Sequence, residues 1–324
     1  MTETPPAPAS QFRRYIEQLE TMGPEALAGM IPASPGRAEL LEKFPELATV
    51  EVRDVTIDGP HGEVPARAYR LPGVAGATGF VWVHGGGWIG GDLDMAEANW
   101  VSLALAARGF AVLSVEYRKA LNGVHYPVPS DDVLAAWNWA AAHAADFGAA
   151  AGDIHLGGAS AGGNLVGGVT KRLRDGDGTG TVPVSLVLVY PALHAGLPPL
   201  SESLRAALAK TSDGTDVGAM SGEVMRELCL QYAGSEDRFD DPYAFPANGD
   251  VLGQPPVFIL NAEADPLRAS GEAYAEALRE AGVDVTVEFE PGTSHGHVNE
   301  PFTDGAQQSI DRIAKWLETH GGTS

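Results

Sequence analysis

The sequence of 324 residues contains a single cysteine, Cys229, which excludes an intramolecular disulfide. Nothing in the chain therefore requires an oxidising compartment, and Cys229 is expected to be a buried, unreactive thiol. The sequence also lacks a His-Glu-x-x-His segment and any cysteine pair, which are the usual signs of a metal site. Its glycine-rich segments match neither the dinucleotide-binding nor the phosphate-binding pattern. We therefore expect no metal and no other cofactor.

Long apolar runs are absent as well. The chain has no stretch of about 18 consecutive apolar residues, so no membrane-spanning helix is expected. Residues 1–6 have neither the basic nor the apolar region of a secretory signal. A cytoplasmic location is the resulting expectation.

Basic residues are scarce, with 21 Lys and Arg against 43 Asp and Glu and a formal net charge of −22. Phosphate backbones and anionic lipid surfaces repel such a chain, so we expect neither nucleic acid nor a membrane as a partner. Net charge otherwise bears on solubility and association rather than on chemistry.

What the sequence does contain is an alternation of short apolar segments with stretches of helical periodicity. This alternation predicts an α/β fold in which helices cover both faces of a mostly parallel sheet. Two alternating runs ahead of it, at 50–57 and 64–71, end in turn residues and predict a hairpin at the sheet edge, which brings the expected strands to eight. The other strands are expected at 80–83, 111–115, 154–156, 184–189, 257–260 and 283–289, and the helices at 95–107, 130–145, 162–174, 269–281 and 305–320.

One gap interrupts this rhythm. Between the strands that end near Tyr190 and begin near Pro256 lie about 65 residues, too many for a structureless loop in a compact domain. Helical patterns at 203–210 and 223–233 indicate an inserted subdomain, and further helical spacing occurs within 11–47. We expect N-terminal cap helices in 1–48, a catalytic core in 49–194 and 253–324, and a cap insertion in 195–252.

The clearest chemical motif is Gly-Ala-Ser-Ala-Gly at 158–162, which satisfies the pattern G-x-S-x-G. The pattern alone carries little weight in a chain with 40 glycines. Here, however, it follows an apolar strand segment and opens a helical run, which is the context that a nucleophile elbow requires. The sharp turn leaves no room for flanking side chains and exposes the hydroxyl of Ser160, which we predict to be a nucleophile.

A second glycine-rich segment, His-Gly-Gly-Gly-Trp at 84–88, follows the strand expected at 80–83. Acyl transfer develops negative charge on a carbonyl oxygen, and backbone N–H groups can stabilise it only where the backbone comes close. The segment therefore predicts an oxyanion hole. Its expected residues are Gly86 and Gly87 as preferred donors, the amide of Ala161 as a third donor, and Gly85 as the hinge.

The remaining members of a triad are expected on loops after later strands. Asp265 precedes a proline after the strand at 257–260, and His295 precedes a glycine after the strand at 283–289. The resulting order Ser, Asp, His is that of α/β hydrolases, and all three lie at the carboxyl edge of the sheet. His295 would accept the serine proton, and Asp265 would orient it. Glu263 and His297, each two residues away, are the rival acid and base.

At these residues the chain resembles the hormone-sensitive-lipase-like group of carboxylesterases, also called bacterial family IV. The resemblance rests on the segments 84–88, 158–164, 264–267 and 295–296, and is supported by Tyr-Arg at 117–118 and Asp-Asp at 131–132. It implies an α/β-hydrolase core, a helical cap, hydrolysis of short acyl esters, and the oxyanion donors named above. It also implies a homodimer through the edge strand near 283–289.

Three positions depart from the usual pattern of this group. Ala159 stands where an acidic or hydroxyl residue is usual, and His297 replaces the usual aromatic after His-Gly. Lys119, with the two residues after it, departs from the usual sequence after Tyr-Arg. None of these changes removes an atom of the predicted triad, so we expect them to affect substrate choice.

Together the motifs predict a serine carboxylesterase that acts on short-to-medium acyl esters through an acyl-enzyme. Amide or lactone hydrolysis would use the same residues, and receptors on this fold that bind a small molecule lack the base that His295 provides. Trp88 is expected either to line the substrate pocket or to pack under the cap. A capped pocket favours acyl groups of about two to eight carbons, each buried methylene contributing roughly 0.8 kcal/mol.

Overall fold

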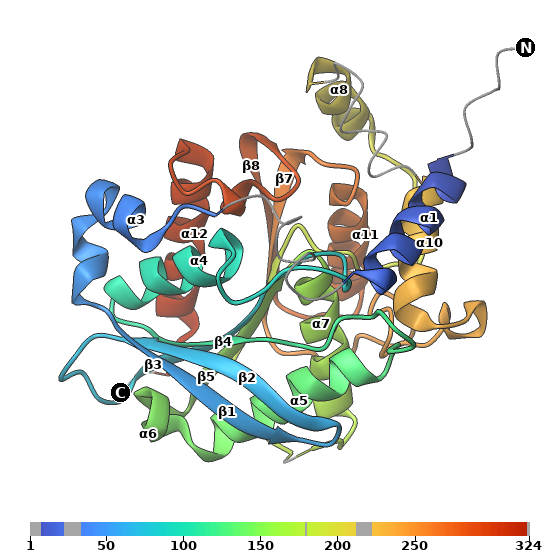
Figure 1. Ribbon diagram of the computed structural model, residues 1–324. Coiled ribbons are helices and arrows are strands. Elements are labelled where there is room, and N and C mark those ends of the chain that lie inside the picture. Colours follow the sequence, from blue (N-terminus) through green and yellow to red (C-terminus); the bar gives the residue numbers. More distant parts are fainter. Residues whose placement is uncertain (1–7, 23–33, 179, 212–221, 323–324) are drawn as a thin grey trace, which may run out of the picture.

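The computed structural model describes residues 8–22, 34–178, 180–211 and 222–322, and an eight-stranded sheet forms its centre (Figure 1). The strand order is β1-β2-β4-β3-β5-β6-β7-β8. The strands are β1 (Glu51–Gly59), β2 (Gly62–Arg70), β3 (Ala77–Val83), β4 (Ala111–Val115), β5 (Ala149–Ala159), β6 (Leu186–Val189), β7 (Val257–Ala264) and β8 (Val285–Ser294).

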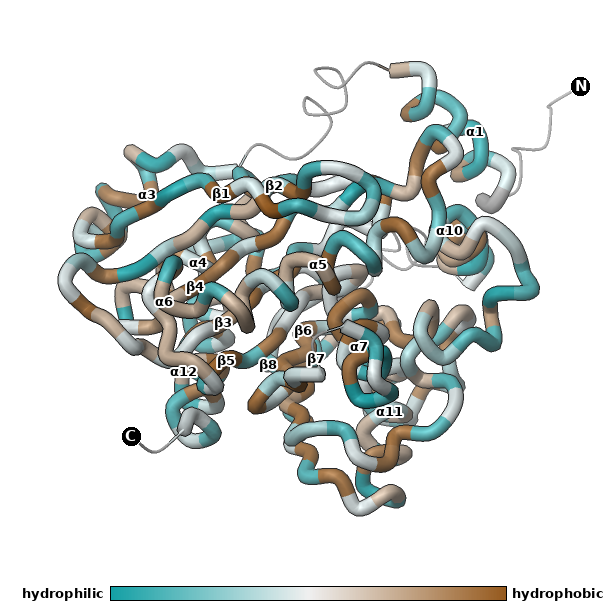
Figure 2. The backbone as a smooth tube through the Cα atoms, turned by 90° about the horizontal axis from the view of Figure 1, so that it is seen from below, coloured by the Kyte–Doolittle hydropathy of each residue, from teal (hydrophilic) through white to brown (hydrophobic). Residues whose placement is uncertain are grey.

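The sheet is mostly parallel. From β4 through β3, β5, β6 and β7 to β8, neighbouring strands pair in parallel, and only the β1–β2 hairpin and the β2–β4 pair are antiparallel. All residues of β4 and β6 are buried, as expected for strands covered on both faces, and the inner strands are among the hydrophobic stretches of the chain (Figure 2). The predicted α/β fold, its eight strands and its edge hairpin are confirmed.

Two hydrophobic clusters lie on opposite faces of the sheet, because successive strand residues point to opposite sides. Val81 and Val83 of β3 belong to one cluster, and Phe80 and Trp82 belong to the other. The first cluster is covered by α5 (Val128–Ala142), α7 (Ala161–Arg174) and α11 (Arg268–Glu280), and the second by α3 (Arg37–Lys43), α4 (Ala96–Ala107) and α12 (Asp304–His320). Figure 1 shows α4 and α12 together on one side and α5 and α7 on the other.

The remaining helices are shorter or lie toward the margins of the sheet. They are α1 (Pro8–Thr21), α6 (Ala144–Phe147), α8 (Glu202–Thr211) and α10 (Gly222–Ala233), with the 3₁₀ turns η1 (Pro45–Thr49), η2 (Glu236–Arg238) and η3 (His297–Asn299). Of these, α6 and α10 add residues to the first cluster. No helix within the described ranges is long and apolar enough to cross a membrane.

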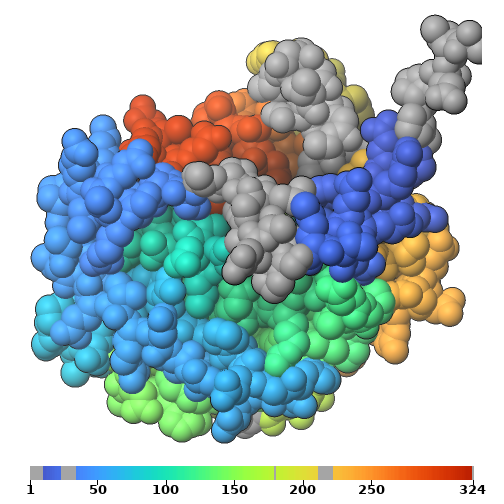
Figure 3. Space-filling model, in the orientation of Figure 1, coloured from blue at the N-terminus to red at the C-terminus, as the bar shows by residue number. Residues whose placement is uncertain are grey.

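Helices α1 and α10 lie side by side although they are far apart in the sequence (Figures 1 and 3). An ion pair of 2.6 Å joins Arg13 of α1 to Glu227 of α10. Ile16 and Leu19 of α1 form a small cluster with Leu121, in the loop after β4. Helix α3, also N-terminal, packs through Leu40 with the cluster that contains α4.

Candidate active site

Ser160 occupies the turn between β5 and α7 in a strained backbone conformation, with φ 52° and ψ −115°. The turn is tight on both sides of the serine. A Cβ atom on Gly158 would lie 2.5 Å from the carbonyl carbon of Gly162, and one on Gly162 would lie 2.2 Å from the carbonyl oxygen of Val83. Side chains at either glycine are therefore excluded, and the serine is presented at the carboxyl edge of the sheet.

A hydrogen-bonded chain leads from this serine to a buried acid. Ser160 Oγ lies 3.0 Å from His295 Nε2, and His295 Nδ1 lies 2.7 Å from Asp265 Oδ2. Asp265 is fully buried and also accepts a hydrogen bond from the amide of Leu267. Burial lowers the pKa of His295, but the charge and hydrogen bond of Asp265 outweigh this effect, so the pKa is raised above its ordinary value. The structure thus brings the three predicted residues into contact.

The two rival residues are engaged elsewhere. Glu263 Oε2 accepts a hydrogen bond of 2.7 Å from the amide of Gly292. His297 Nε2 lies 2.7 Å from Ser309 Oγ, on α12, and burial lowers the pKa of His297 to about 4. These contacts direct both side chains away from Ser160.

Three of the predicted oxyanion residues, Gly85, Gly86 and Gly87, lie in a loop after β3, residues 84–91, which we call the glycine loop, and the fourth, Ala161, is the first residue of α7. The N–H groups of Gly86, Gly87 and Ala161 donate to no acceptor within the described part of the chain. Gly86 has φ +102°, and a Cβ atom on it would lie 2.2 Å from the carbonyl oxygen of Gly90, so only glycine fits. Gly85 differs, because its N–H donates to Glu97 and its carbonyl accepts a 2.8 Å hydrogen bond from Tyr117.

Three polar residues of this region were not predicted: Glu97, Tyr190 and Asn299. Glu97 accepts hydrogen bonds from the side chains of Tyr190 and Asn299 and is 2% exposed. A signal for Glu97 was present, because helix 96–107 is apolar on all sides and an acidic residue within it has to be buried. Tyr190 and Asn299 carry no comparable local signal.

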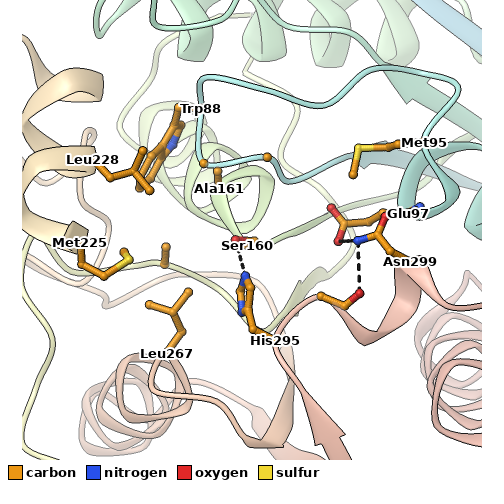
Figure 4. A pocket seen from close by; sticks show the side chains of 14 residues that line it. Trp88, Met95, Glu97, Ser160, Ala161, Met225, Leu228, Leu267, His295 and Asn299 are labelled. Carbon is orange, nitrogen blue, oxygen red and sulfur yellow. Dashed lines mark hydrogen bonds between the residues drawn. The ribbon is translucent and has the colours of Figure 1, made fainter. Parts of the chain in front are cut away.

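A cavity of about 280 Å³ opens in front of Ser160 (Figure 4). One side of it is mainly apolar, and the other side carries Glu97 and Asn299 beside Met95. Trp88 lines the cavity and also stacks on Tyr232 of α10, with ring centroids 4.7 Å apart, and its contact with a substrate stays a prediction. The apolar lining consists of Trp88, Ala192, Met225, Leu228 and Leu267.

Within residues 8–22, 34–178, 180–211 and 222–322, no group of three or more His, Cys, Asp or Glu side chains is arranged to hold a metal ion. Cys229 is buried in α10, and burial raises the pKa of its thiol to about 12. The serine, histidine and carboxylate groups of this site can carry out nucleophilic and acid–base chemistry.

A parallel sheet with a strained serine at a strand–helix turn, hydrogen-bonded to a histidine from a later loop, defines the class of α/β hydrolases. Comparison with known proteins agrees, since the profile of the alpha/beta hydrolase fold family matches residues 80–299. The chain belongs to the hormone-sensitive-lipase-like esterases of this family, which confirms the resemblance inferred from its motifs.

Two curated relatives come from Mycobacterium tuberculosis. The carboxylic ester hydrolase LipN is 37% identical over 260 residues, which span 77% of this chain and 65% of LipN. Carboxylesterase NlhH is 35% identical over 264 residues, or 80% of this chain and 78% of NlhH. Among solved structures, the Pyrobaculum calidifontis esterase is similar with a TM-score of 0.76 and 28% identity, covering 95% of this chain and 97% of that one.

Proposed function

We propose that this protein is a serine carboxylesterase that hydrolyses short-to-medium acyl esters through an acyl-enzyme. The observation that carries the proposal is the hydrogen-bonded chain Ser160–His295–Asp265, which faces free backbone amides across the opening of a small cavity. The names of relatives such as LipN and NlhH support ester hydrolysis.

In the proposed mechanism, His295 Nε2 takes the proton of Ser160 as the serine oxygen attacks the ester carbonyl. The amides of Gly86, Gly87 and Ala161 stabilise the negative charge that develops on the carbonyl oxygen. The imidazolium then gives its proton to the departing alcohol, which leaves an acyl group on the serine. A water molecule then attacks the acyl group in the same way, while His295 accepts a proton from the water and returns it to the serine oxygen. The carboxylic acid is released and the serine is restored. Asp265 keeps the histidine in the required tautomer throughout.

The size of the cavity supports small substrates. Pockets for drug-sized ligands span about 300 to 1,000 Å³, and the cavity in front of Ser160 lies just below this range at about 280 Å³. Its apolar side accepts an acyl chain, and its walls limit the length of that chain. We further propose that the cap segments 1–48 and 195–252 surround a core of 49–194 and 253–324. The second cap segment contributes to the wall through Met225 and Leu228.

Two further proposals concern the surroundings of the protein. We propose a homodimer through β8, which lies at the edge of the sheet and pairs only with β7 among the described strands. We also propose a cytoplasmic location, which is consistent with a lone buried cysteine and can be checked by cell fractionation.

The function is tested by incubating the protein with a fluorophosphonate probe and by following p-nitrophenyl butyrate hydrolysis. We expect one covalent adduct, located on Ser160 by mass spectrometry. Ser160→Ala should lose the adduct and reduce kcat by several orders of magnitude, because the triad acts as a unit. A folded Ser160→Ala protein with undiminished turnover would refute the proposal, and a wild-type protein without an adduct would indicate a receptor.

A further inference from the structure

Glu97, in the first turn of α4, is a buried carboxylate whose hydrogen-bond partners come from three separate segments, and Figure 4 shows one of them, Asn299. Oε1 accepts from the amide of Gly85, in the glycine loop. Oε2 accepts from the hydroxyl of Tyr190, after β6, at 2.5 Å, and from Nδ2 of Asn299, in η3, at 3.2 Å. All three partners are donors, which is the arrangement that an ionised carboxylate requires.

On one side of the site, Glu97 holds the start of the glycine loop in place. A Cβ atom on Gly85 would lie 2.7 Å from Glu97 Oε1 and 3.0 Å from the Cβ of Ser160, so the Gly85 peptide fills the space between the two side chains. The carbonyl of Gly85 is held as well, by the hydroxyl of Tyr117 and by Nδ1 of His84, each at 2.8 Å. With both its N–H and its carbonyl bonded, Gly85 sets the direction of the two amides that follow it.

On the other side, Glu97 is linked to the segment that carries the histidine, residues 294–299, which we call the histidine loop. Asn299 Oδ1 accepts a 3.0 Å hydrogen bond from the amide of Glu97, and Asn299 Nδ2 also donates to the carbonyl of Gly296 at 3.2 Å. Tyr190 packs against His295, with ring centroids 4.9 Å apart at 61°. One carboxylate thus connects the proposed oxyanion donors with the proposed base.

The charge of this carboxylate acts on the histidine too. Among the described residues no Lys or Arg is paired with Glu97, so its charge is balanced only by hydrogen-bond donors. After the larger effects of burial and Asp265, the charge of Glu97 contributes to raising the pKa of His295. The titratable groups that face this cluster are Tyr117 after β4, Tyr190 after β6, Asp265 after β7 and His297 in η3.

We propose that Glu97 is a positioning residue, whose carboxylate fixes the positions of the glycine loop and the histidine loop relative to each other on either side of Ser160. The proposal rests on the esterase function proposed above and extends it to a residue outside the triad. Glu97 does not touch the reacting atoms. It acts through Gly85 on the oxyanion amides and through Asn299 and Tyr190 on the base, where small misplacements are costly for the rate.

The test compares Glu97→Gln with Glu97→Asp. The glutamine retains the size but removes the charge and turns an N–H₂ group toward one set of donors. We expect kcat to fall about 10- to 100-fold with KM within twofold, because the affected amides act in the transition state. The acidic limb of kcat/KM should also move to lower pH, since loss of the negative charge lowers the pKa of His295.

Glu97→Asp retains the charge but is one methylene too short to reach both loops. We expect Glu97→Asp to lower kcat about as much as Glu97→Gln, while the acidic limb of kcat/KM stays near its wild-type pH. A merely structural role would not separate the effect on kcat from the effect on the pH profile in this way. Glu300→Gln, which removes an exposed carboxylate next to Asn299, is the matched control and should leave both quantities unchanged. Wild-type kcat together with a wild-type acidic limb in Glu97→Gln would overturn the proposal.

Two measurements keep the test decisive. If Glu97→Gln does not fold, Tyr190→Phe provides the test, because it removes one hydrogen-bond donor and leaves the carboxylate in place. We expect kcat of this variant to fall several-fold with KM unchanged. An unaltered kcat would count against the proposal. The rate of fluorophosphonate labelling of Ser160 reports on the same geometry without an ester substrate. If Glu97→Gln is labelled slowly and the wild type rapidly, the positioning role of Glu97 is supported. This holds even for a wild type that hydrolyses no ester, because the lack of ester hydrolysis would refute only the proposed substrate.

Discussion

Individual residues of this protein differ sharply in how they respond to pH. His297 stands at a position that is usually aromatic in the group, and the structure buries it between Tyr190 and Ser309. Burial lowers the pKa of His297 to about 4, and the same cause lowers the pKa values of His155 and His194 to about 4. An unfolded histidine titrates near pH 6.5, so these residues take up protons on unfolding between those pH values.

This difference makes the stability of the protein dependent on pH. Between about pH 6.5 and pH 4 the unfolded state binds more protons, so the free energy of unfolding falls as the pH falls, by up to about 1.4 kcal/mol per pH unit for each histidine. His297→Phe should make this decline shallower, as measured by urea unfolding at several pH values. His143→Phe changes an exposed histidine, leaves His155, His194 and His297 in place, and serves as the control. If the free energy of unfolding falls equally steeply with pH in the His297→Phe variant and in the wild type, the expectation is contradicted.

Functional residues could be predicted from the sequence only where a short motif around the residue identifies it. Ser160 and His295 each lie beside glycines in short motifs, and Asp265 precedes a proline, so neighbouring residues identify them. Glu97 has no such neighbours, since its partner Asn299 lies 202 residues away. Its hydrogen bonds depend on the packing of separate segments, which no local pattern records.

Among the elements, all eight strands were predictable, but the ends of several were not: β5 runs over Ala149–Ala159, although only 154–156 was expected. Strand β4 runs over the predicted residues because all of its residues except Ser114 are apolar and all are buried. Strand β8 starts at Val285 rather than 283 and continues to Ser294, past Pro291 and Gly292, where turn residues suggested an end. Pairing with β7 carries it on, with an irregularity between Ala262 and Ala264 that local sequence does not reveal.

Helix α10 is the element through which substrate length can be changed. Leu228 lines the cavity, and a Cβ atom on Gly87 would lie 3.1 Å from its Cδ2, so this side chain closes the cavity directly over the glycine loop. Leu228→Ala removes the volume of about three methylene groups and should shift the best p-nitrophenyl ester to an acyl chain longer by about two or three carbons.

The panel of esters should be repeated with Leu230→Ala, the matched control. Leu230 is on the same helix and half-buried, but it does not line the cavity. We expect this variant to keep the wild-type chain-length profile. An identical profile for all three proteins would mean that α10 does not set the length limit, and a rate that rises at an oil–water interface would argue against a closed pocket.

For the molecule as a whole, the two edges of the sheet differ in their surroundings. Strand β1 is mostly exposed and belongs to a hairpin, whereas β8, the last strand in the chain, pairs with the buried strand β7 and has an exposed Phe289. An edge strand presents unpaired backbone groups that another copy can pair with. If β8 forms the proposed dimer, a charge at Phe289 will block the pairing.

Sedimentation velocity can test this expectation with a matched pair. Phe289 and Val52 are 40% and 39% exposed and lie on opposite edge strands. We expect the wild type and Val52→Lys to sediment as dimers and Phe289→Lys as a monomer of 33.8 kDa. A monomeric wild type at micromolar concentration, or dissociation by Val52→Lys instead, would refute a dimer through β8.

The order in which the strands occur along the chain has a consequence for biosynthesis. The serine and the glycine loop leave the ribosome early, whereas the histidine follows β8, the last strand of the sheet, and lies 135 residues beyond the serine. A nascent chain therefore carries a nucleophile without its base until the final strand has been added to the edge. Hydrolytic competence therefore arises only after β8 has joined the edge, so the appearance of activity marks the completion of the sheet.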